Sequence, residues 1–308
     1  MNRRDFVAKV SVLGAGISAL SGTVANAKAS NRTIPIVDTH LHLWDRSVME
    51  YPWLSGMLDR DFLPGDFAEA SKPTPVAKMV FVECGRLPEQ YLREVDWVIS
   101  QAKQEPRIKG MVAYFPLEKG LVAKGEMEQL VGRGIVKGIR RGVSEQLLAS
   151  TDFLKGVELM GSYGLSYDLN ITPSLMEPAL NFVRRFPQQT FVLNHIANPD
   201  IKGRAQFDHW RRFLSDFGEL AHVVCKVSGL ITKADPNRWD ASDLEPYLDH
   251  VFAVFGTDKV VFGGDWPVVL RAGSYRSWME VFLGYTEQLS VEERKKVYHL
   301  NAERVYRI

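Results

Sequence analysis

The segment IVDTHLH, residues 36–42, is a short apolar run that ends in polar residues, and the same pattern recurs along the chain. Seven further runs follow, separated by longer stretches in which apolar residues recur with the period of a helix. This alternation is typical of a parallel sheet whose strands are joined by crossover helices. Strands are predicted at Ile36–His42, Ala77–Cys84, Ile108–Tyr114, Ile135–Arg140, Leu165–Asn170, Thr190–His195, Val223–Val227 and Lys259–Asp265.

The connections between these runs have the patterns of amphipathic helices. After the second run, one apolar face extends from Tyr91 to Ala102 in a helix that begins near Pro88. Further helices are predicted at Pro173–Arg185, Ala205–Leu220, Ala241–Phe255, Tyr275–Leu289 and, as a closing helix, Val291–Tyr306. Eight such cycles predict an α/β fold, a single-domain (βα)8 TIM barrel over residues 34–308. A doubly wound open sheet is the competing architecture, but no Gly-rich phosphate loop follows the first strand to favour it.

The first 29 residues differ in composition from the rest of the chain. Arg3 and Arg4 precede a stretch rich in Val, Leu, Gly, Ala and Ser, and Ala25-Asn26-Ala27 supplies a small-x-small cleavage site. Paired arginines are typical of a twin-arginine export signal. A transmembrane anchor is disfavoured because it needs about 20 predominantly apolar residues, and the apolar stretch here is shorter and interrupted by Gly and Ser. We therefore expect residues 1–29 to be a removable signal peptide and the protein to be periplasmic or secreted, without a membrane anchor after cleavage.

Charge and cysteine content narrow the class of partner. The chain has 38 Lys+Arg and 37 Asp+Glu residues, a formal net charge of +1, so it lacks the basic surplus that nucleic-acid binding requires. A small neutral or weakly anionic molecule is the expected partner. The two cysteines, Cys84 and Cys225, lie in separate predicted strands, which argues against a disulfide framework. Composition gives no prediction of the oligomeric state.

Four polar residues end three of the predicted strands. His40 and His42 lie two residues apart, so they point to the same side of the first strand and could bind one metal ion together. His195 ends the sixth strand and Asp265 the eighth. Because strand ends converge on one cavity in a barrel, we expect all four side chains to meet there. The alternatives are local hydrogen bonding for the histidine pair and a helix N-cap for Asp265.

Two arginines at the end of the fourth strand are candidates for substrate binding. Strand parity turns only one of Arg140 and Arg141 inward, and parity does not say which. An inward guanidinium would bind a substrate carboxylate or hydroxyls. The other arginine would lie at the surface.

The other substrate-binding candidates are acidic and aromatic. Glu83 on the second strand and Asp168 on the fifth could line the pocket or orient the histidines, and Lys226 has the same ambiguity. Trp44 opens the long aromatic segment after the first strand, and Trp266 follows Asp265. The segments 44–75 and 233–239 are expected to shape the pocket because they follow strand ends. We interpret the remaining histidines as structural: His209, His222, His250 and His299.

Seven short motifs support a family resemblance that runs from about residue 36 to the C-terminus. They are DTHLHLWD (38–45), YPW (51–53), DFLP (61–64), GIR (138–140), NH (194–195), CKVSGL (225–230) and DWPV (265–268). This set resembles the amidohydrolase-related (amidohydrolase 2) family of metal-dependent TIM-barrel hydrolases, in particular its fuconolactonase and rhamnonolactonase group. The resemblance implies a catalytic centre of His40, His42, His195 and Asp265, with Asp265 as the base that activates water and Arg140 in substrate binding.

The resemblance leaves the metal open. The family contains members that work without a metal, and this chain lacks the strand-five histidine of the two-metal amidohydrolases. One divalent ion, with zinc as the first expectation, or none is implied. His40, His42, His195 and Asp265 are the ligands we expect for such an ion.

The expected reaction is hydrolysis of a sugar-acid lactone by water that Asp265 activates. Relatives usually carry His, Asp and Glu where this chain has Arg141, Asn194 and Lys233, so the identity of the sugar does not carry over. A sugar-lactone isomerase or a decarboxylase on the same scaffold is an alternative. A periplasmic sugar-binding protein without turnover is another.

Overall fold

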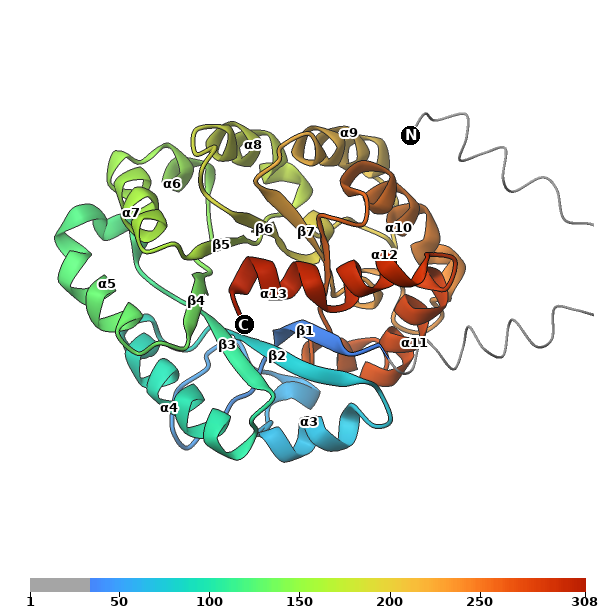
Figure 1. Ribbon diagram of the computed structural model, residues 1–308, viewed down its shortest axis with the longest axis horizontal. Helices are drawn as coiled ribbons and strands as arrows, with labels where there is room; N and C mark the ends of the chain where they lie inside the picture. Colours follow the sequence, from blue (N-terminus) through green and yellow to red (C-terminus); the bar gives the residue numbers. More distant parts are fainter. Residues whose placement is uncertain (1–33) are drawn as a thin grey trace, which may run out of the picture.

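Eight apolar segments pair as parallel strands, and their order in the sheet is their order in the sequence (Figure 1). The computed structural model describes residues 34–308, so the predicted export signal at residues 1–29 lies outside the described residues. The strands are β1 (Ile36–Leu41), β2 (Val76–Val82), β3 (Ile108–Ala113), β4 (Val136–Ile139), β5 (Ser166–Leu169), β6 (Phe191–Leu193), β7 (Val223–Val227) and β8 (Val260–Phe262).

Hydrogen bonds between β1 and β8, and between the residues that follow these two strands, close the ring of strands. The His42 amide donates to the Trp266 carbonyl at 2.8 Å, and the Asp265 amide donates to the His40 carbonyl at 2.8 Å. The Thr39 hydroxyl donates to the Phe262 carbonyl at 2.6 Å. Together with the parallel order of the strands, these bonds confirm the predicted (βα)8 barrel. They also hold the two segments that carry His40, His42 and Asp265 against each other.

The crossover helices surround this ring. They are α3 (Pro64–Ala70), α4 (Tyr91–Gln104), α5 (Lys124–Val131), α6 (Glu145–Ala149), α7 (Thr151–Ser162), α8 (Met176–Arg184), α9 (Phe207–Gly218), α10 (Ala241–Phe255) and α11 (Tyr275–Thr286). Within residues 34–308, none of the helices has the length and apolar character needed to cross a bilayer.

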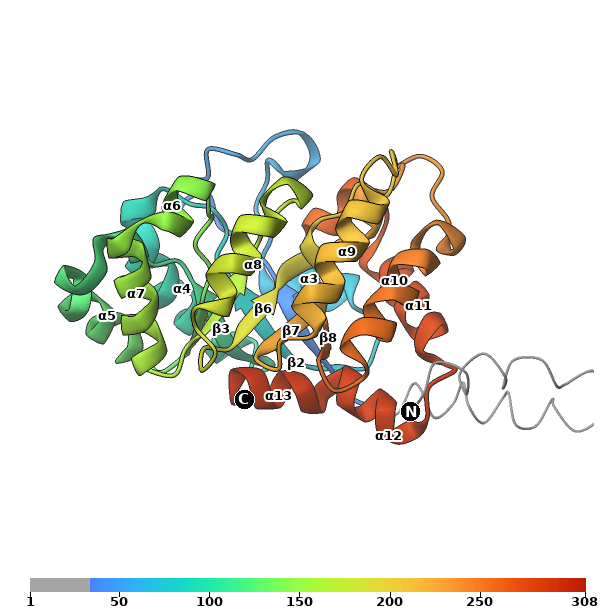
Figure 2. The ribbon, with the colours of Figure 1, turned by 90° about the horizontal axis from the view of Figure 1, so that it is seen from above.

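The predicted closing helix Val291–Tyr306 is not continuous. α12 (Val291–Lys295) and α13 (Asn301–Tyr306) flank a π-helical turn at Lys296–Leu300. The Asn301 side chain donates to the carbonyls of Thr257 and Val260, both at 2.8 Å, and so ties the start of α13 to β8. Figure 2 shows α12 and α13 on one face of the barrel and the segment after β1 on the opposite face.

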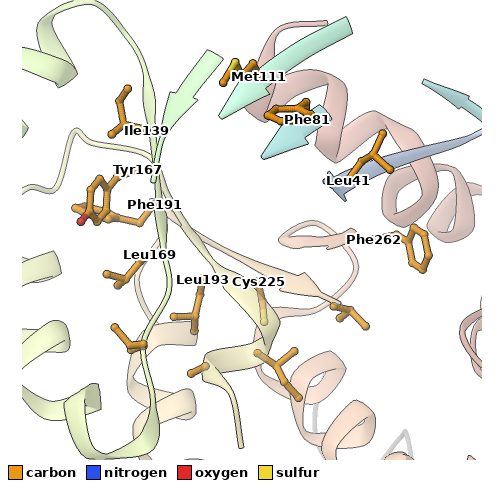
Figure 3. Packing of buried hydrophobic residues seen from close by; sticks show 14 of the residues in the cluster. Leu41, Phe81, Met111, Ile139, Tyr167, Leu169, Phe191, Leu193, Cys225 and Phe262 are labelled. Atoms are coloured by element: carbon orange, nitrogen blue, oxygen red, sulfur yellow. The ribbon is translucent and has the colours of Figure 1, made fainter. Parts of the chain in front are cut away.

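Apolar side chains fill two layers on the two sides of the strands. The outer layer packs strand residues such as Phe81, Tyr167 and Phe262 against the helices (Figure 3). The inner layer is made of valines from β1, β2, β3, β6, β7 and β8, and Val305 and Tyr306 of α13 pack against them. Alternation of side chains along each strand produces both layers, and the narrow interior of an eight-stranded barrel favours small branched residues. Cys84 and Cys225 are free and buried.

Candidate active site

His40 and His42 point to the same place, as their spacing predicts. Their Nε2 atoms lie 3.1 Å apart, and each Nε2 lies 3.7 Å from Oδ1 of Asp265. His40 is fully buried, and His42 and Asp265 are nearly so. Three ligand-type atoms from the end of β1 and the end of β8 therefore converge on one point.

Hydrogen bonding sets the proton position on His42. Its Nδ1 lies 2.8 Å from the Val82 carbonyl, which can only accept, so Nδ1 carries the proton and Nε2 presents its lone pair to His40 and Asp265. Burial, with a smaller contribution from Arg140, lowers the pKa of His42 to about 3. Burial, with His195 next, also lowers the pKa of His40 well below its ordinary value. Both rings are thus neutral, which is the form in which imidazole binds metals.

The geometry of these three atoms fits a divalent ion. Their ligand atoms all lie within 4.8 Å of one another. Two bonds of about 2.1 Å to a tetrahedral zinc separate the ligand atoms by about 3.4 Å. The observed separations of 3.1 and 3.7 Å lie on either side of that value. His40, His42 and Asp265 could therefore hold one divalent ion such as zinc.

Asp265 lies three residues after the end of β8, on strained backbone with a φ of 54°. A non-glycine residue in the left-handed region costs about 1–3 kcal/mol, a strain that often marks functional sites. Burial raises the pKa of its carboxyl to about 7, although Arg140 and Lys233 act against this rise. Its carboxylate faces the two histidines. The turn that follows, Val268–Arg271, has Pro267 and not Asp265 at its N-cap position, so the helix-cap alternative is not seen.

His195 lies beside this group and not within it. It begins a run of four residues with positive φ, residues 195–198, which turns the chain sharply after β6. Its ring centre is 4.4 Å from that of His40, and its Nδ1 lies 2.9 Å from the Ser228 hydroxyl. The atoms that converge for metal binding belong to His40, His42 and Asp265, so the structure does not place His195 as the fourth ligand that we predicted.

Gly229 lies against both His195 and Asp265. Its φ is +68°, and a Cβ at this position would lie 2.7 Å from Nδ1 of His195 and 3.0 Å from Oδ2 of Asp265. A side chain here would displace one of the two reactive groups, and positive φ disfavours any residue but glycine. The loop after β7 therefore contributes to the site because glycine, which has no side chain, leaves space for His195 and Asp265.

Arg140 is the arginine that turns toward the pocket. Its Nε donates to Oε1 of Glu83 at 2.8 Å, one Nη donates to the Glu83 carbonyl, and the other lies 3.5 Å from Nε2 of His40. Glu83 also binds Arg86 at 3.2 Å. Burial alone would raise the pKa of Glu83, but the two guanidinium groups hold it below its ordinary value. Glu83 is thus an ionised support for Arg140, and it is not among the residues that line the pocket.

These groups open into a cavity of about 380 Å³. A volume of this size suits a small-molecule ligand. The lining residues come from the loops after β1, β2 and β4 to β8, at the carboxyl ends of the strands. They are His42, Trp53, Cys84, Gly85, Arg140, Asn170, His195, Asn198, Thr232, Lys233, Asp265, Val268 and Arg271.

Besides Glu83, three more of the predicted substrate-binding residues lie outside this lining. Arg141 points away from the pocket and forms a two-bond ion pair with Glu118, at 2.9 and 3.0 Å. Trp44 is fully buried, and its indole N–H donates to the Arg60 carbonyl at 2.6 Å. Trp266 is also buried and packs against Phe62 with ring centres 5.2 Å apart. None of these three side chains lines the cavity, so they do not belong to the candidate substrate site.

Asp168 is also displaced from the site that we predicted. Its carboxylate is fully buried inside the barrel, where Oδ2 lies 2.6 Å from Nζ of Lys226 and 2.9 Å from the hydroxyl of Tyr306. Because Tyr306 belongs to α13 and Nζ of Lys226 also lies 2.8 Å from the Thr39 carbonyl of β1, this cluster lies inside the barrel between α13 and β1. Asp168 and Lys226 thus form an interior ion pair and do not line the pocket.

Sequence reasoning also missed residues that do line the pocket. Trp53 forms one wall and donates its indole N–H to the Cys84 carbonyl at 2.6 Å. Its signal was present, because it lies in the aromatic segment expected to shape the pocket. Asn170 ends the fifth predicted strand, a position that could have singled it out, whereas Asn198 and Arg271 lie in predicted loops, where polar residues are common. The four histidines interpreted as structural bond to groups outside the lining, namely Pro173, Val183, Arg211, Ser215 and Glu303.

Comparison with known proteins gives consistent matches over nearly all of the described chain. A sequence model of the amidohydrolase family matches residues 37–308. An L-fucono-1,5-lactonase of Burkholderia multivorans is 30% identical over 291 residues, covering 88% of this chain and 95% of that protein. An L-fucono-1,5-lactonase of Burkholderia ambifaria is 29% identical over 287 residues, covering 88% and 95%. The crystal structure of an amidohydrolase from Burkholderia multivorans with bound zinc has a TM-score of 0.78 and 27% identity, covering 89% of this chain and 99% of that one.

Proposed function

This chain belongs to the amidohydrolase family, and from this premise we propose that it hydrolyses the lactone of a sugar acid. The observation that carries the proposal is the convergence of Asp265, His40 and His42 beside Arg140, at a cavity that His42, Arg140 and Asp265 line. The relatives named as L-fucono-1,5-lactonases support a lactone as the substrate class.

In each step of lactone hydrolysis, residues of this chain have a defined role. Arg140, fixed by Glu83, donates a hydrogen bond to the lactone carbonyl oxygen and stabilises the charge that develops on it. A divalent ion held by His40, His42 and Asp265 would supply Lewis-acid polarisation at the same place. Asp265 accepts a proton from water as the water oxygen bonds to the carbonyl carbon. The ring C–O bond then breaks, and the proton passes to the released oxygen, which leaves an open-chain sugar acid.

A screen of sugar-acid lactones with a pH indicator tests this function, because each turnover at neutral pH releases one acid. The zinc-supplemented protein should acidify at least one lactone solution. Asp265→Asn should lower kcat by about a thousandfold or more, since it removes the base. Asp208→Asn is the matched control, because Asp208 lies on α9 with a side chain that is 96% exposed. Near-normal turnover by Asp265→Asn at an unchanged unfolding midpoint would refute the assignment.

Analysis of the products separates the rival functions. Proton NMR distinguishes an open-chain acid from a rearranged lactone, which an isomerase would produce. Release of CO2 would indicate a decarboxylase. Tight binding of a sugar without any new product would indicate a binding protein.

We also propose that residues 1–29 are a twin-arginine signal that delivers the enzyme to the periplasm. N-terminal sequencing of the exported protein tests this. A mature chain that still begins at Met1 would refute the proposal.

A further inference from the structure

Two cations on the pocket wall have no carboxylate partner among residues 34–308. Lys233 ends the turn Ile231–Lys233 after β7, and Arg271 ends the turn Val268–Arg271 after β8. Neither forms an ion pair with a described Asp or Glu, whereas Arg140 and Arg141 are each paired with a glutamate. Arg271 lies with its guanidinium carbon 5.8 Å from the ring centre of Trp53. Arg271 is exposed, Lys233 is half-buried, and both line the cavity, so both are available to a ligand there.

Lys233 and Arg271 line the same cavity as Asp265, His195 and Arg140. One small molecule in that cavity can therefore contact the two cations and the catalytic groups together.

The balance of charge in the pocket points to an anionic ligand. Glu83 neutralises Arg140, and Asp265 is the carboxylate in the lining. Lys233 and Arg271 add two positive charges opposed by that one carboxylate, which a metal ion would itself offset. The other polar lining groups on this side, Asn170 and Asn198, are neutral and bond to each other at 2.8 Å. Two cations without a carboxylate partner in one pocket are a typical binding site for a carboxylate of a ligand.

We propose that Lys233 and Arg271 bind a second carboxylate of the substrate, so that the enzyme prefers the lactone of a sugar diacid over that of a sugar monoacid. This inference rests on the proposed lactonase function and specifies its substrate class. The reacting carbonyl lies beside Arg140 and Asp265, and the free carboxylate lies toward the pocket entrance. A cavity of about 380 Å³ has room for a six-carbon lactone in this orientation.

Two lactones that differ at one carbon provide the test. One is a six-carbon aldonolactone that ends in a hydroxymethyl group, and the other is the corresponding aldarolactone that ends in a carboxylate. The zinc-supplemented enzyme should show a kcat/KM at least tenfold higher for the aldarolactone, and salt should reduce this preference because ions screen exposed charges. Lys233→Met and Arg271→Gln should each lower the ratio of the two kcat/KM values severalfold, and together at least tenfold.

Arg276→Gln is the matched control, since Arg276 is an exposed cation on α11 that pairs with Glu280 at 2.8 Å, outside the pocket. It should leave the ratio unchanged. Equal kcat/KM values for the two lactones, or a ratio that does not respond to Lys233→Met and Arg271→Gln, would overturn the inference while leaving the lactonase function intact.

Calorimetric titration with the open-chain aldarate and aldonate separates this inference from the function on which it rests. The aldarate should bind at least tenfold more tightly, and Lys233→Met should remove most of that difference. If no lactone is hydrolysed but the aldarate still binds in this way, the anion site stands and the hydrolase proposal fails. If lactones are hydrolysed and the two acids bind equally, the anion site fails.

Discussion

Replacing Lys226 by methionine should strongly destabilise the barrel without touching the pocket lining. Lys226 is fully buried on β7, and its Nζ lies 2.6 Å from Oδ2 of Asp168 and 2.8 Å from the Thr39 carbonyl. The Tyr306 hydroxyl completes the set at 2.9 Å from the same Asp168 oxygen. Lys226→Met leaves the Asp168 carboxylate in the barrel interior with two hydroxyl donors, Tyr306 and Ser166, and no counter-charge.

The size of the effect follows from this geometry. Removing one partner of a buried ion pair costs about 3–5 kcal/mol, because the other charge stays desolvated. Tyr306→Phe removes one hydrogen bond to a charged group and should cost about 1.5–3 kcal/mol. The double variant Lys226→Met/Asp168→Leu removes both charges, and apolar replacement of a buried pair is often neutral or stabilising. It should therefore be more stable than Lys226→Met alone.

Urea unfolding monitored by tryptophan fluorescence, at a fixed zinc concentration, measures these differences. Lys295→Met is the control, because Lys295 pairs with Glu292 on the surface, where ion pairs contribute at most about 1 kcal/mol. A loss of less than about 1 kcal/mol in Lys226→Met would refute this account of the ion pair. So would a double variant whose loss equals the sum of the two single losses, since the pair would then make no coupled contribution.

Two further predictions concern the metal and the thiols. Prolonged dialysis against a chelator should abolish lactone hydrolysis, and added zinc should restore it. His42→Gln should not regain activity at the same zinc concentration, because it lacks one of the ligands. Full activity after chelation, with no metal found by elemental analysis, would exclude an essential ion. Burial raises the pKa of the Cys84 and Cys225 thiols. A thiol reagent at pH 8 should therefore label neither cysteine in the native enzyme and both in urea. Fast labelling of a cysteine in the native enzyme would contradict the burial of that side chain.

The catalytic candidates found from the sequence meet because strand geometry is a local rule. Alternation along β1 is enough to put His40 and His42 on one side, and parallel strands in a closed barrel carry Asp265 to the same end. The same alternation predicts that Arg140 and Arg141 face opposite sides of β4, but it does not predict which of them faces the pocket. Which of them enters the pocket depends on how β4 is paired with its neighbours, and that information is not local.

Other assignments required long-range contacts. Asp168 and His195 are both polar residues at or near strand ends, yet Asp168 pairs with Lys226 inside the barrel and His195 reaches the pocket. The difference arises because the chain turns through positive φ at His195, a conformation that side-chain pattern does not reveal. Likewise Trp44 and Trp53 look equivalent in the sequence, but Trp44 is fully buried and Trp53 lines the cavity.

Periodicity by itself determined the order of the strands and helices and the set of polar residues at the strand ends, since both follow from interactions within a few residues. Tertiary structure alone decided the membership of the pocket. The closure of the barrel, which brings the strand ends together at the pocket, depends on bonds such as that from Thr39 to Phe262. These residues are 223 positions apart, and no pattern of neighbouring residues encodes such a bond. The unpaired charges of Lys233 and Arg271 became visible in the same way, because a missing partner is a property of the folded surroundings and not of the residue.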